Sequence, residues 1–130
     1  MQADIELVRR IVDALNRSDV GAMLAEMHPN FEWWPIETSP IARVYRGHEQ
    51  VRGYIEDWLG TFERVRLELE DPAEVADRVV ATVRGRARGR GSGLEIDNRF
   101  CQVWTVRDGT AVAMEEHATR EQALAALGCG

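Results

Sequence analysis

Two adjacent carboxylates near the C-terminus, Glu115 and Glu116, are the side chains best placed for acid–base chemistry. They end an alternating run, 110–117, that follows a second strand-like run, 98–106, across an Asp-Gly turn. Because side chains of a strand point alternately to its two faces, one carboxylate faces the interior and the other does not. A carboxylate in an apolar interior must be paired, protonated, near water or functional.

The turn decides which acid faces inward, and the sequence allows two turns. A two-residue type I′ turn at Asp108-Gly109 pairs Arg107 with Thr110. A three-residue loop, with Gly109 in a G1 bulge, pairs Val106 with Thr110 instead. The two alternatives place the side chains of the second strand on opposite faces. We favour the three-residue loop, because it separates apolar from polar side chains better.

The three-residue loop predicts one large, mostly apolar face with polar residues embedded in it. Its members are Asn98, Phe100, Gln102, Trp104, Val106, Val112, Met114 and Glu116. The opposite face carries Arg99, Cys101, Val103, Thr105, Ala111, Ala113, Glu115 and His117. The two-residue loop would instead put Gln102 on the same face as Glu115.

We therefore predict that Glu116 is a general acid or base that acts on a proton next to a carbonyl group. Gln102 and Asn98 are predicted to donate hydrogen bonds to the developing enolate oxygen. The indole N–H of Trp104 or Trp33 could serve in the same way. The alternative is that Glu116 is a strand-end carboxylate, either solvated or paired with an arginine.

Bulky side chains are predicted to form the wall of a pocket for a flat, apolar ligand. The predicted ligand-binding residues are Trp33, Tyr54, Trp58, Phe100, Trp104 and Met114. Tyr54 lies at the edge of a helical stripe, from which its hydroxyl could reach the pocket. The competing interpretation is that the tryptophans are ordinary core residues.

Composition narrows the possible functions. The chain of 130 residues is long enough for one domain, 1–130, with a real core. Its net charge of −6 argues against a nucleic-acid partner. All 16 basic residues are arginine, which excludes lysine Schiff-base chemistry, pyridoxal-phosphate attachment and P-loop nucleotide binding. The three histidines form no metal-type set with spaced carboxylates, so no metal and no other cofactor is predicted.

Cysteine usage and the polar start of the chain predict a cytoplasmic protein. Cys101 and Cys129 lack a metal-type spacing and are expected to be free thiols in a reducing compartment. The first residues are polar and acidic, unlike a signal peptide, and no apolar run approaches the length of a membrane span.

The elements that must position these residues are helices first and strands later. Helical spacing of apolar residues predicts helices over 3–17, about 19–27, about 49–62 and 119–127. Strands are predicted at 31–34, from Val65 onward, at 79–90 and in the hairpin, with a loop over 36–47 and a bend at Asp71-Pro72. This order implies an α+β fold, in which a cone-shaped, curved antiparallel sheet wraps around the N-terminal helices and encloses a cavity.

Arginines alternate with small residues along the predicted strand 79–90. Arg84, Arg86, Arg88 and Arg90 would form a solvated strand face or a dimer rim, with Glu68 and Glu70 as cross-strand partners. An RNA-binding arginine–glycine segment is the weaker alternative.

Several short motifs, in order, resemble the nuclear transport factor 2-like superfamily and its SnoaL-like, polyketide cyclase-like branch. They are Arg17-Ser-Asp19, His28-Pro-Asn30 before an aromatic strand, Tyr45-Arg-Gly-His-Glu-Gln-Val-Arg52, Val103-Trp-Thr-Val-Arg-Asp-Gly109 and Ala123-Leu-Ala-Ala-Leu-Gly128. The resemblance covers nearly the whole chain. It implies a cystatin-like α+β barrel and a homodimer formed through the outer sheet face, where Cys101, Val103, Ala111 and Ala113 would suit the packing.

The resemblance also implies which activities to expect. Cyclases and epoxide hydrolases of this superfamily place an acid on the last strand, and Glu116 matches that position. The epoxide hydrolase also holds a water with a Tyr and an Asn on the first strand, where this chain has Phe31 and Trp33. Epoxide hydrolysis by that mechanism is therefore not expected, and the isomerase's Tyr and Asp oxyanion hole has no counterpart that we can place.

Three functions remain open from the sequence. The first is a cofactor-free isomerase or cyclase, similar in type to ketosteroid isomerase, that uses Glu116 on an apolar carbonyl substrate. The second is a non-catalytic binding protein for a small hydrophobic ligand. The third is a structural dimeric module whose cavity is filled by its own side chains.

Overall fold

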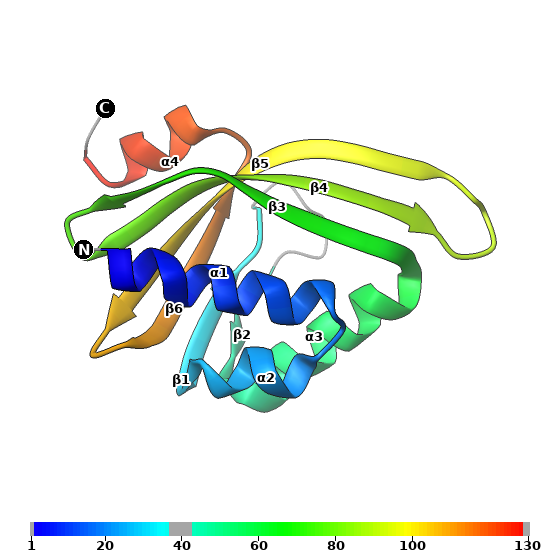
Figure 1. Cartoon of the computed structure of the whole chain (residues 1–130), viewed down its shortest axis with the longest axis horizontal. Helices are drawn as coiled ribbons and strands as arrows, with labels where there is room; N and C mark the ends of the chain where they lie inside the picture. The colour runs from blue at the N-terminus through cyan, green and yellow to red at the C-terminus, as the bar shows by residue number, and fades with distance from the viewer. Residues whose placement is uncertain (1, 37–42, 129–130) are drawn as a thin grey trace.

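The computed structural model describes residues 2–36 and 43–128 (Figure 1). Residues 37–42, which belong to the predicted loop 36–47, and Cys129 lie outside the described part. Three helices come first in the chain and one comes last. They are α1 (Gln2–Asn16), α2 (Val20–Ala25), α3 (Gly47–Thr61) and α4 (Arg120–Ala126). The four predicted helices are therefore present, with ends that differ by a few residues.

The strands form one mixed sheet of six. They are β1 (Met27–Trp34), β2 (Tyr45–Arg46), β3 (Phe62–Val75), β4 (Arg78–Gly89), β5 (Glu95–Arg107) and β6 (Thr110–His117). Their order is β2-β1-β6-β5-β4-β3. Neighbours are antiparallel except β1 and β6, which run parallel. The chain between β1 and β6 includes α3 and four strands, so no tight turn forces this pair to be antiparallel.

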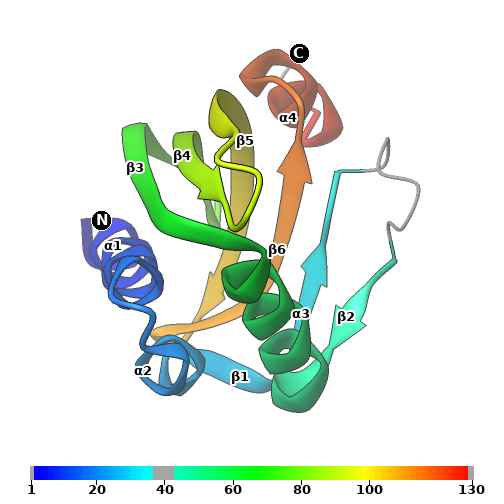
Figure 2. The same cartoon turned by 90° about the vertical axis from the view of Figure 1, so that its right-hand side faces the viewer.

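Helices cover both sides of the curved sheet (Figures 1 and 2). The first three lie on the concave side, where their apolar stripes meet the inner side chains of the strands in the main core. Val8 and Ile11 of α1 and Ile55 of α3 are almost completely buried there. The predicted α+β fold, with a curved sheet over N-terminal helices, is confirmed.

Two register shifts bend β3. They lie between Glu63 and Arg66 and between Glu70 and Ala73. Asp71, at the second shift, has a positive φ of 50°. Because an extra residue in one strand makes the pair bend and twist more strongly, these shifts curve the sheet toward the helices. The predicted bend at Asp71-Pro72 is therefore a bulge within one continuous strand.

The β5–β6 hairpin turns over two residues, so the predicted three-residue loop is wrong. Arg107 pairs with Thr110, and Asp108 and Gly109 both have positive φ, 53° and 74°. This is the pattern of a type I′ turn, whose twist matches that of the two strands it joins.

A bulge next to the turn nevertheless restores the predicted faces. Val106 pairs with Ala111, but Thr105 pairs with Ala113, so Val112 has no partner on β5. That extra residue shifts the register by one. From the bulge onward, each inner residue of β5 is opposite an inner residue of β6. Trp104 is opposite Met114 and Gln102 is opposite Glu116.

Between the turn and the bulge, the predicted faces are reversed. Ala111 is fully buried and belongs to the main core together with Val106. Val112, which we expected in that position, is only partly buried. The correction follows from the two-residue turn, which governs the register as far as the bulge.

The C-terminal helix covers part of the outer sheet face. Ala123 of α4 packs against Val80, Cys101 and Val103 in a second, smaller core. Cys101 and Val103 are therefore buried within the chain, and Ala111 lies in the main core. Three of the four small residues expected to face a dimer partner are thus covered by the chain itself.

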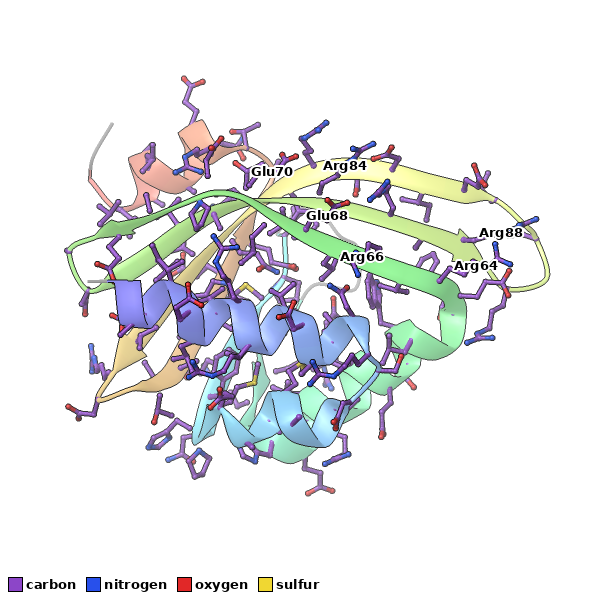
Figure 3. All side chains as sticks on the ribbon, viewed as in Figure 1. Arg64, Arg66, Glu68, Glu70, Arg84 and Arg88 are labelled. Carbon is purple, nitrogen blue, oxygen red and sulfur yellow. The ribbon has the colours of Figure 1, made fainter. Side chains whose placement is uncertain are left out.

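Arginines and acids alternate over the remaining outer surface of β3, β4 and β5 (Figure 3). Arg99 donates to both carboxylate oxygens of Glu70, at 2.8 and 3.3 Å, and Arg86 donates to Glu68. The predicted pairing of Glu68 with an arginine of β4 is confirmed, whereas Glu70 pairs with Arg99 of β5 and not with one of the four predicted arginines. Over residues 2–36 and 43–128, no helix has the length and hydrophobicity needed to cross a membrane.

Candidate functional site

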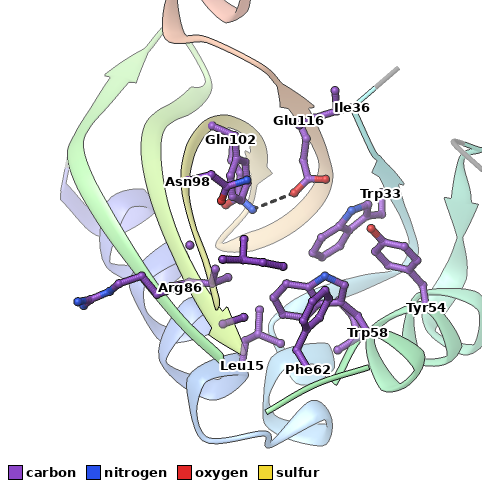
Figure 4. A pocket seen from close by; sticks show the side chains of 16 residues that line it. Leu15, Trp33, Ile36, Tyr54, Trp58, Phe62, Arg86, Asn98, Gln102 and Glu116 are labelled. Carbon is purple, nitrogen blue, oxygen red and sulfur yellow. Dashed lines mark hydrogen bonds between the residues drawn. The ribbon is translucent and has the colours of Figure 1, made fainter. Parts of the chain in front are cut away.

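A cavity of about 260 Å³ lies between α3 and the concave face of the sheet (Figure 4). Elements far apart in the sequence enclose it, including the end of α1, β1, α3 and the inner faces of β3 to β6. The lining residues are Leu15, Trp33, Ile36, Tyr54, Ile55, Trp58, Phe62, Leu67, Gly85, Arg86, Ala87, Ile96, Asn98, Phe100, Gln102 and Glu116. Most of these are apolar, which is typical of a site for a small organic molecule.

Aromatic rings form much of the wall. The rings of Trp33 and Tyr54 lie 5.7 Å apart, and those of Trp58 and Phe62 lie 5.6 Å apart, in tilted and edge-to-face arrangements. The far side of Tyr54 stacks on Tyr45 at 4.4 Å. Because each ring packs against another, the aromatic wall is preorganised.

Glycine at position 85 leaves room in the opposite wall. A Cβ at this position would lie 3.3 Å from the side-chain oxygen of Asn98 and 3.4 and 3.5 Å from Leu67 and Phe100. The missing side chain therefore lets these three residues approach the backbone of β4 and keeps the cavity open above them.

Glu116 lies at one end of this cavity, and its side chain points toward it (Figure 4). Burial raises the pKa of Glu116 from an ordinary 4.5 to about 7. Hydrogen bonding by the Gln102 amide and attraction by the Trp33 indole N–H act in the opposite direction. Glu116 is therefore divided between its charged and neutral forms near neutral pH, which suits a group that both takes up and releases protons.

Gln102 connects Glu116 to the core. Its amide nitrogen Nε2 donates to Glu116 Oε2 at 3.5 Å, and its oxygen Oε1 accepts from the indole Nε1 of Trp104 at 3.0 Å. Gln102 is only 2% exposed, so both ends of its amide are engaged inside the protein. Such a buried polar group is held in one orientation by its partners.

The indole N–H of Trp33 is buried without a hydrogen-bond partner among the described residues. Trp33 is 5% exposed, and its nitrogen lies on the side of the ring that faces Glu116 (Figure 4). It makes no hydrogen bond of normal geometry in the described part of the chain, but it is close enough to Glu116 to lower the pKa of that group. Its place beside the carboxyl group marks this end of the cavity as polar.

The Tyr54 phenol also lies close enough to the carboxyl group of Glu116 for its charge to act on it. Burial raises the pKa of Tyr54, and the charges of Glu116 and Tyr45 raise it further. Tyr54 is therefore a neutral phenol throughout the range in which Glu116 titrates, able to donate its hydrogen but not to act as a base.

Seven of the nine predicted site residues line the cavity. They are Glu116, Gln102, Asn98, Trp33, Tyr54, Trp58 and Phe100. Trp104 and Met114 do not line it, because they lie behind the wall, 1% and 0% exposed, in the core. Their face of the strand was predicted correctly, but a strand face does not show how far along it the cavity extends.

Sequence reasoning missed other lining residues that a recognisable pattern could have identified. Ile96 extends the inward alternation of Asn98 and Phe100 by one further step. Phe62 continues the apolar stripe of α3. Ile36, by contrast, follows a proline in a predicted loop and carries no periodic signal.

Arg86 is the only basic residue among the described lining residues, and its charge points away from the cavity (Figure 4). Its guanidinium is paired with Glu68 on the outer surface. Within the described part of the chain, no three His, Cys, Asp or Glu side chains gather as they would around a metal ion.

Known structures with the same architecture identify the fold. An NTF2-like protein from Burkholderia pseudomallei superposes with a TM-score of 0.81, at 24% identity, over 96% of this chain and 97% of that one. TerC, crystallised with polyporic acid, superposes with a TM-score of 0.79, at 24% identity, over 96% and 97%. A SnoaL-like polyketide cyclase from Jannaschia sp. CCS1 superposes with a TM-score of 0.79, at 19% identity, over 99% and 94%. The fold is that of the nuclear transport factor 2-like class.

The sequence places the chain more narrowly within this class. The family model of the SnoaL-like domain matches residues 8–114, and the chain belongs to that family. No match was found among curated proteins. The family and fold resemblance predicted from the short motifs is thus confirmed.

Proposed function

We propose that the protein is a cofactor-free isomerase or cyclase that acts on a small apolar carbonyl compound, with Glu116 as the group that moves the proton. The observation that carries this proposal is the carboxyl group of Glu116 at the polar end of an otherwise apolar, aromatic cavity. Its pKa of about 7 lets it accept a proton from carbon and return it at physiological pH.

The lining of the cavity also indicates which charge the substrate carries. Among the residues that the structure describes, the one basic residue that lines the cavity, Arg86, is turned outward and paired with Glu68. A carboxylate or phosphate would enter the cavity without a cation to neutralise it and would meet the partly ionised Glu116. We therefore expect the substrate to be uncharged, and Asn98 at the cavity rim to contact its oxygen.

Hydrogen–deuterium exchange at carbon tests this proposal without knowledge of the natural substrate. Apolar cyclic ketones such as 1-indanone and 2-tetralone are incubated with the protein in D2O, and loss of the proton next to the carbonyl is followed by NMR. Exchange is expected to rise with pH, with a midpoint near 7. Replacing Glu116 by Gln should reduce catalysed exchange at least about 100-fold, because general-base catalysis contributes on that order.

Glu115 provides the matched control for this experiment. It precedes Glu116 on β6, points to the opposite face, and contacts His117 at 3.2 Å. Glu115→Gln removes the same charge from the same strand and should leave exchange unchanged. Equal losses in the two variants, or no catalysed exchange by the native protein with any ketone that binds, would contradict the proposed chemistry.

A non-catalytic binding protein is the second candidate, and the aromatic wall favours it. Contacts among Trp33, Tyr54, Trp58 and Phe62 form a preorganised surface that binds a flat molecule with or without chemistry. Calorimetry separates the two functions, since a binder would hold 2-tetralone equally well after Glu116→Gln and show no exchange. The open cavity of about 260 Å³ argues against a module whose interior is filled.

We also propose a cellular location and an oligomeric state. The protein is expected in the cytoplasm, where Cys101 would stay reduced. A homodimer is expected through the outer sheet face, now on its charged part beside α4, where arginines and acids alternate and could pair with those of a second copy.

A further inference from the structure

The buried amide of Gln102 lies between an indole N–H, which can only donate a hydrogen bond, and a carboxyl group. On one side is the indole Nε1 of Trp104, at 3.0 Å from Oε1, and on the other is the carboxyl of Glu116, at 3.5 Å from Nε2. Gln102 and Trp104 are two residues apart on β5, so their side chains are neighbours on the same strand face. Glu116 faces them from the paired position on β6.

Trp104 determines which way this amide points. An indole N–H can only donate a hydrogen bond, so the group that meets it must be the amide oxygen. The amide NH2 is then directed at Glu116. If the amide were reversed, its NH2 would face the indole N–H and its oxygen would face the carboxylate, and both contacts would be repulsive.

We propose that Trp104 is a positioning residue for Glu116, which acts by holding the Gln102 amide with its NH2 group toward the carboxyl. This inference deepens the proposed function and rests on it for its catalytic meaning. It also gives Trp104, which lies behind the cavity wall, a part in the site that does not require contact with the ligand.

The direction of the amide has a chemical consequence. A donor aimed at the carboxyl favours its ionised form, so Glu116 begins the reaction as a base. The C–H bond next to the substrate carbonyl breaks, its electron pair forms the enolate, and the proton passes to the carboxylate. The substrate class is therefore a neutral carbon acid, which gives up a proton in the first step.

Replacement of Trp104 by Phe tests the proposal through the titration of Glu116. Side-chain ¹³C labelling of glutamate allows the ionisation midpoint of Glu116 to be measured by NMR without any substrate. In the variant nothing holds the amide NH2 group against the carboxylate, so its stabilisation of the ionised form weakens and the midpoint is expected to rise by about one pH unit. A merely structural role for Trp104 would leave the midpoint unchanged.

Phe31→Leu is the matched control for the loss of ring volume. Phe31 is fully buried, its ring centre lies 6.0 Å from that of Trp104, and it does not line the cavity. This variant loosens the packing around Trp104 but keeps its N–H and the Gln102 amide. Its Glu116 midpoint should match that of the native protein.

Gln102→Met tests the same contact from the other side and serves if Trp104→Phe does not fold. It should raise the Glu116 midpoint by a similar amount and shift the ¹⁵N–¹H signal of the Trp104 indole, which loses its acceptor. In the double variant, Trp104→Phe should add no further rise, because Trp104 acts only through Gln102.

Three results would overturn the proposal: an unchanged midpoint in folded Trp104→Phe, an unchanged midpoint in Gln102→Met, or additive rises in the double variant. These outcomes are distinct from failure of the proposed function. If the midpoints shift as expected but the protein catalyses no ketone exchange, the role of Trp104 in orienting Gln102 is still supported. Only the proposed catalytic function is then contradicted.

Discussion

At the scale of single residues, the main feature of the candidate site is the carboxyl group of Glu116, which is largely shielded from water. The inward direction of Glu116 could be predicted from its spacing of two residues from the apolar Met114, because alternate residues of β6 share a face beyond the bulge. The sequence predicted that Glu116 and Gln102 share a strand face, but it did not predict the hydrogen bond between them. The indole N–H of Trp33 could be named as one of two candidate donors, but its position beside Glu116 could not be predicted, because it depends on the pairing of β1 with β6, two strands far apart in the sequence.

Glu116 should make the stability of the fold depend on pH. Its pKa is about 7 in the folded protein and near 4.5 when unfolded, so the folded state binds the proton more tightly. Stability from this group is fully present below about pH 4.5 and is lost as the pH rises through about 7. Glu116→Gln should therefore be more stable than the native protein at pH 8, by on the order of 3 kcal/mol, and nearly equal to it at pH 4.

Urea unfolding at both pH values measures this difference. Glu121→Gln, which removes an exposed carboxylate from α4, is the control and should show no such change with pH. If Glu116→Gln and the native protein lose stability in parallel between pH 4 and pH 8, Glu116 does not carry a raised pKa.

At the scale of elements, the β5–β6 hairpin shows why a correct face can follow from an incorrect turn. The apolar pattern required Trp104 and Met114 to share a face, and the two-residue turn alone would have separated them. The bulge at Val112 reconciles the two. The apolar pattern could be predicted because burial enforces it, whereas a bulge leaves no mark in the alternation that can be told apart from a longer loop.

Deletion of Val112 should therefore be tolerated better than insertion of a residue beyond it. Without Val112, Ala113 and Met114 would stay opposite Thr105 and Trp104 in a regular hairpin, so the inner face would be kept. We expect the deletion variant to fold and to lose no more than about 1 to 2 kcal/mol of stability, since Val112 is only partly buried. An alanine inserted between Ala113 and Met114 would instead move every side chain from Met114 to His117 to the opposite face, which would bury Glu115, expose Met114 and cost several kcal/mol.

Chemical denaturation followed by circular dichroism compares these two variants. An insertion variant that unfolds at nearly the same denaturant concentration as the deletion variant would show that the inward position of Glu116 does not depend on this register.

At the scale of the whole molecule, the sheet is covered on both sides by different parts of the chain. The α+β order and the family resemblance predicted the concave layer. The family resemblance also predicted that a dimer partner covers the outer face. In the structure, α4 of the same chain covers part of that face. The apolar residues of the C-terminal segment predicted a helix, but not the surface on which it docks, because that choice depends on the tertiary placement of Val80, Cys101 and Val103.

Cys101 reports whether α4 stays in place. Its thiol is fully buried, and burial raises its pKa, so it should react very slowly with a thiol reagent such as Ellman's reagent. In a Cys129→Ser background, so that Cys101 alone is measured, truncation after Ala118 should increase the native-state reaction rate by at least about tenfold, because it opens the outer face. Equal rates with and without α4 would show that the helix does not protect this face.

The alternation of β1 also places two consecutive indoles in opposite surroundings. Trp33 is 5% exposed inside the cavity wall, whereas Trp34 is 42% exposed on the other face. Neighbouring residues therefore carry chromophores that differ in solvent contact, so that iodide quenches the emission of Trp34 while a ligand in the cavity alters that of Trp33. One strand supplies both a reporter of occupancy and its internal reference, with no label added to the protein.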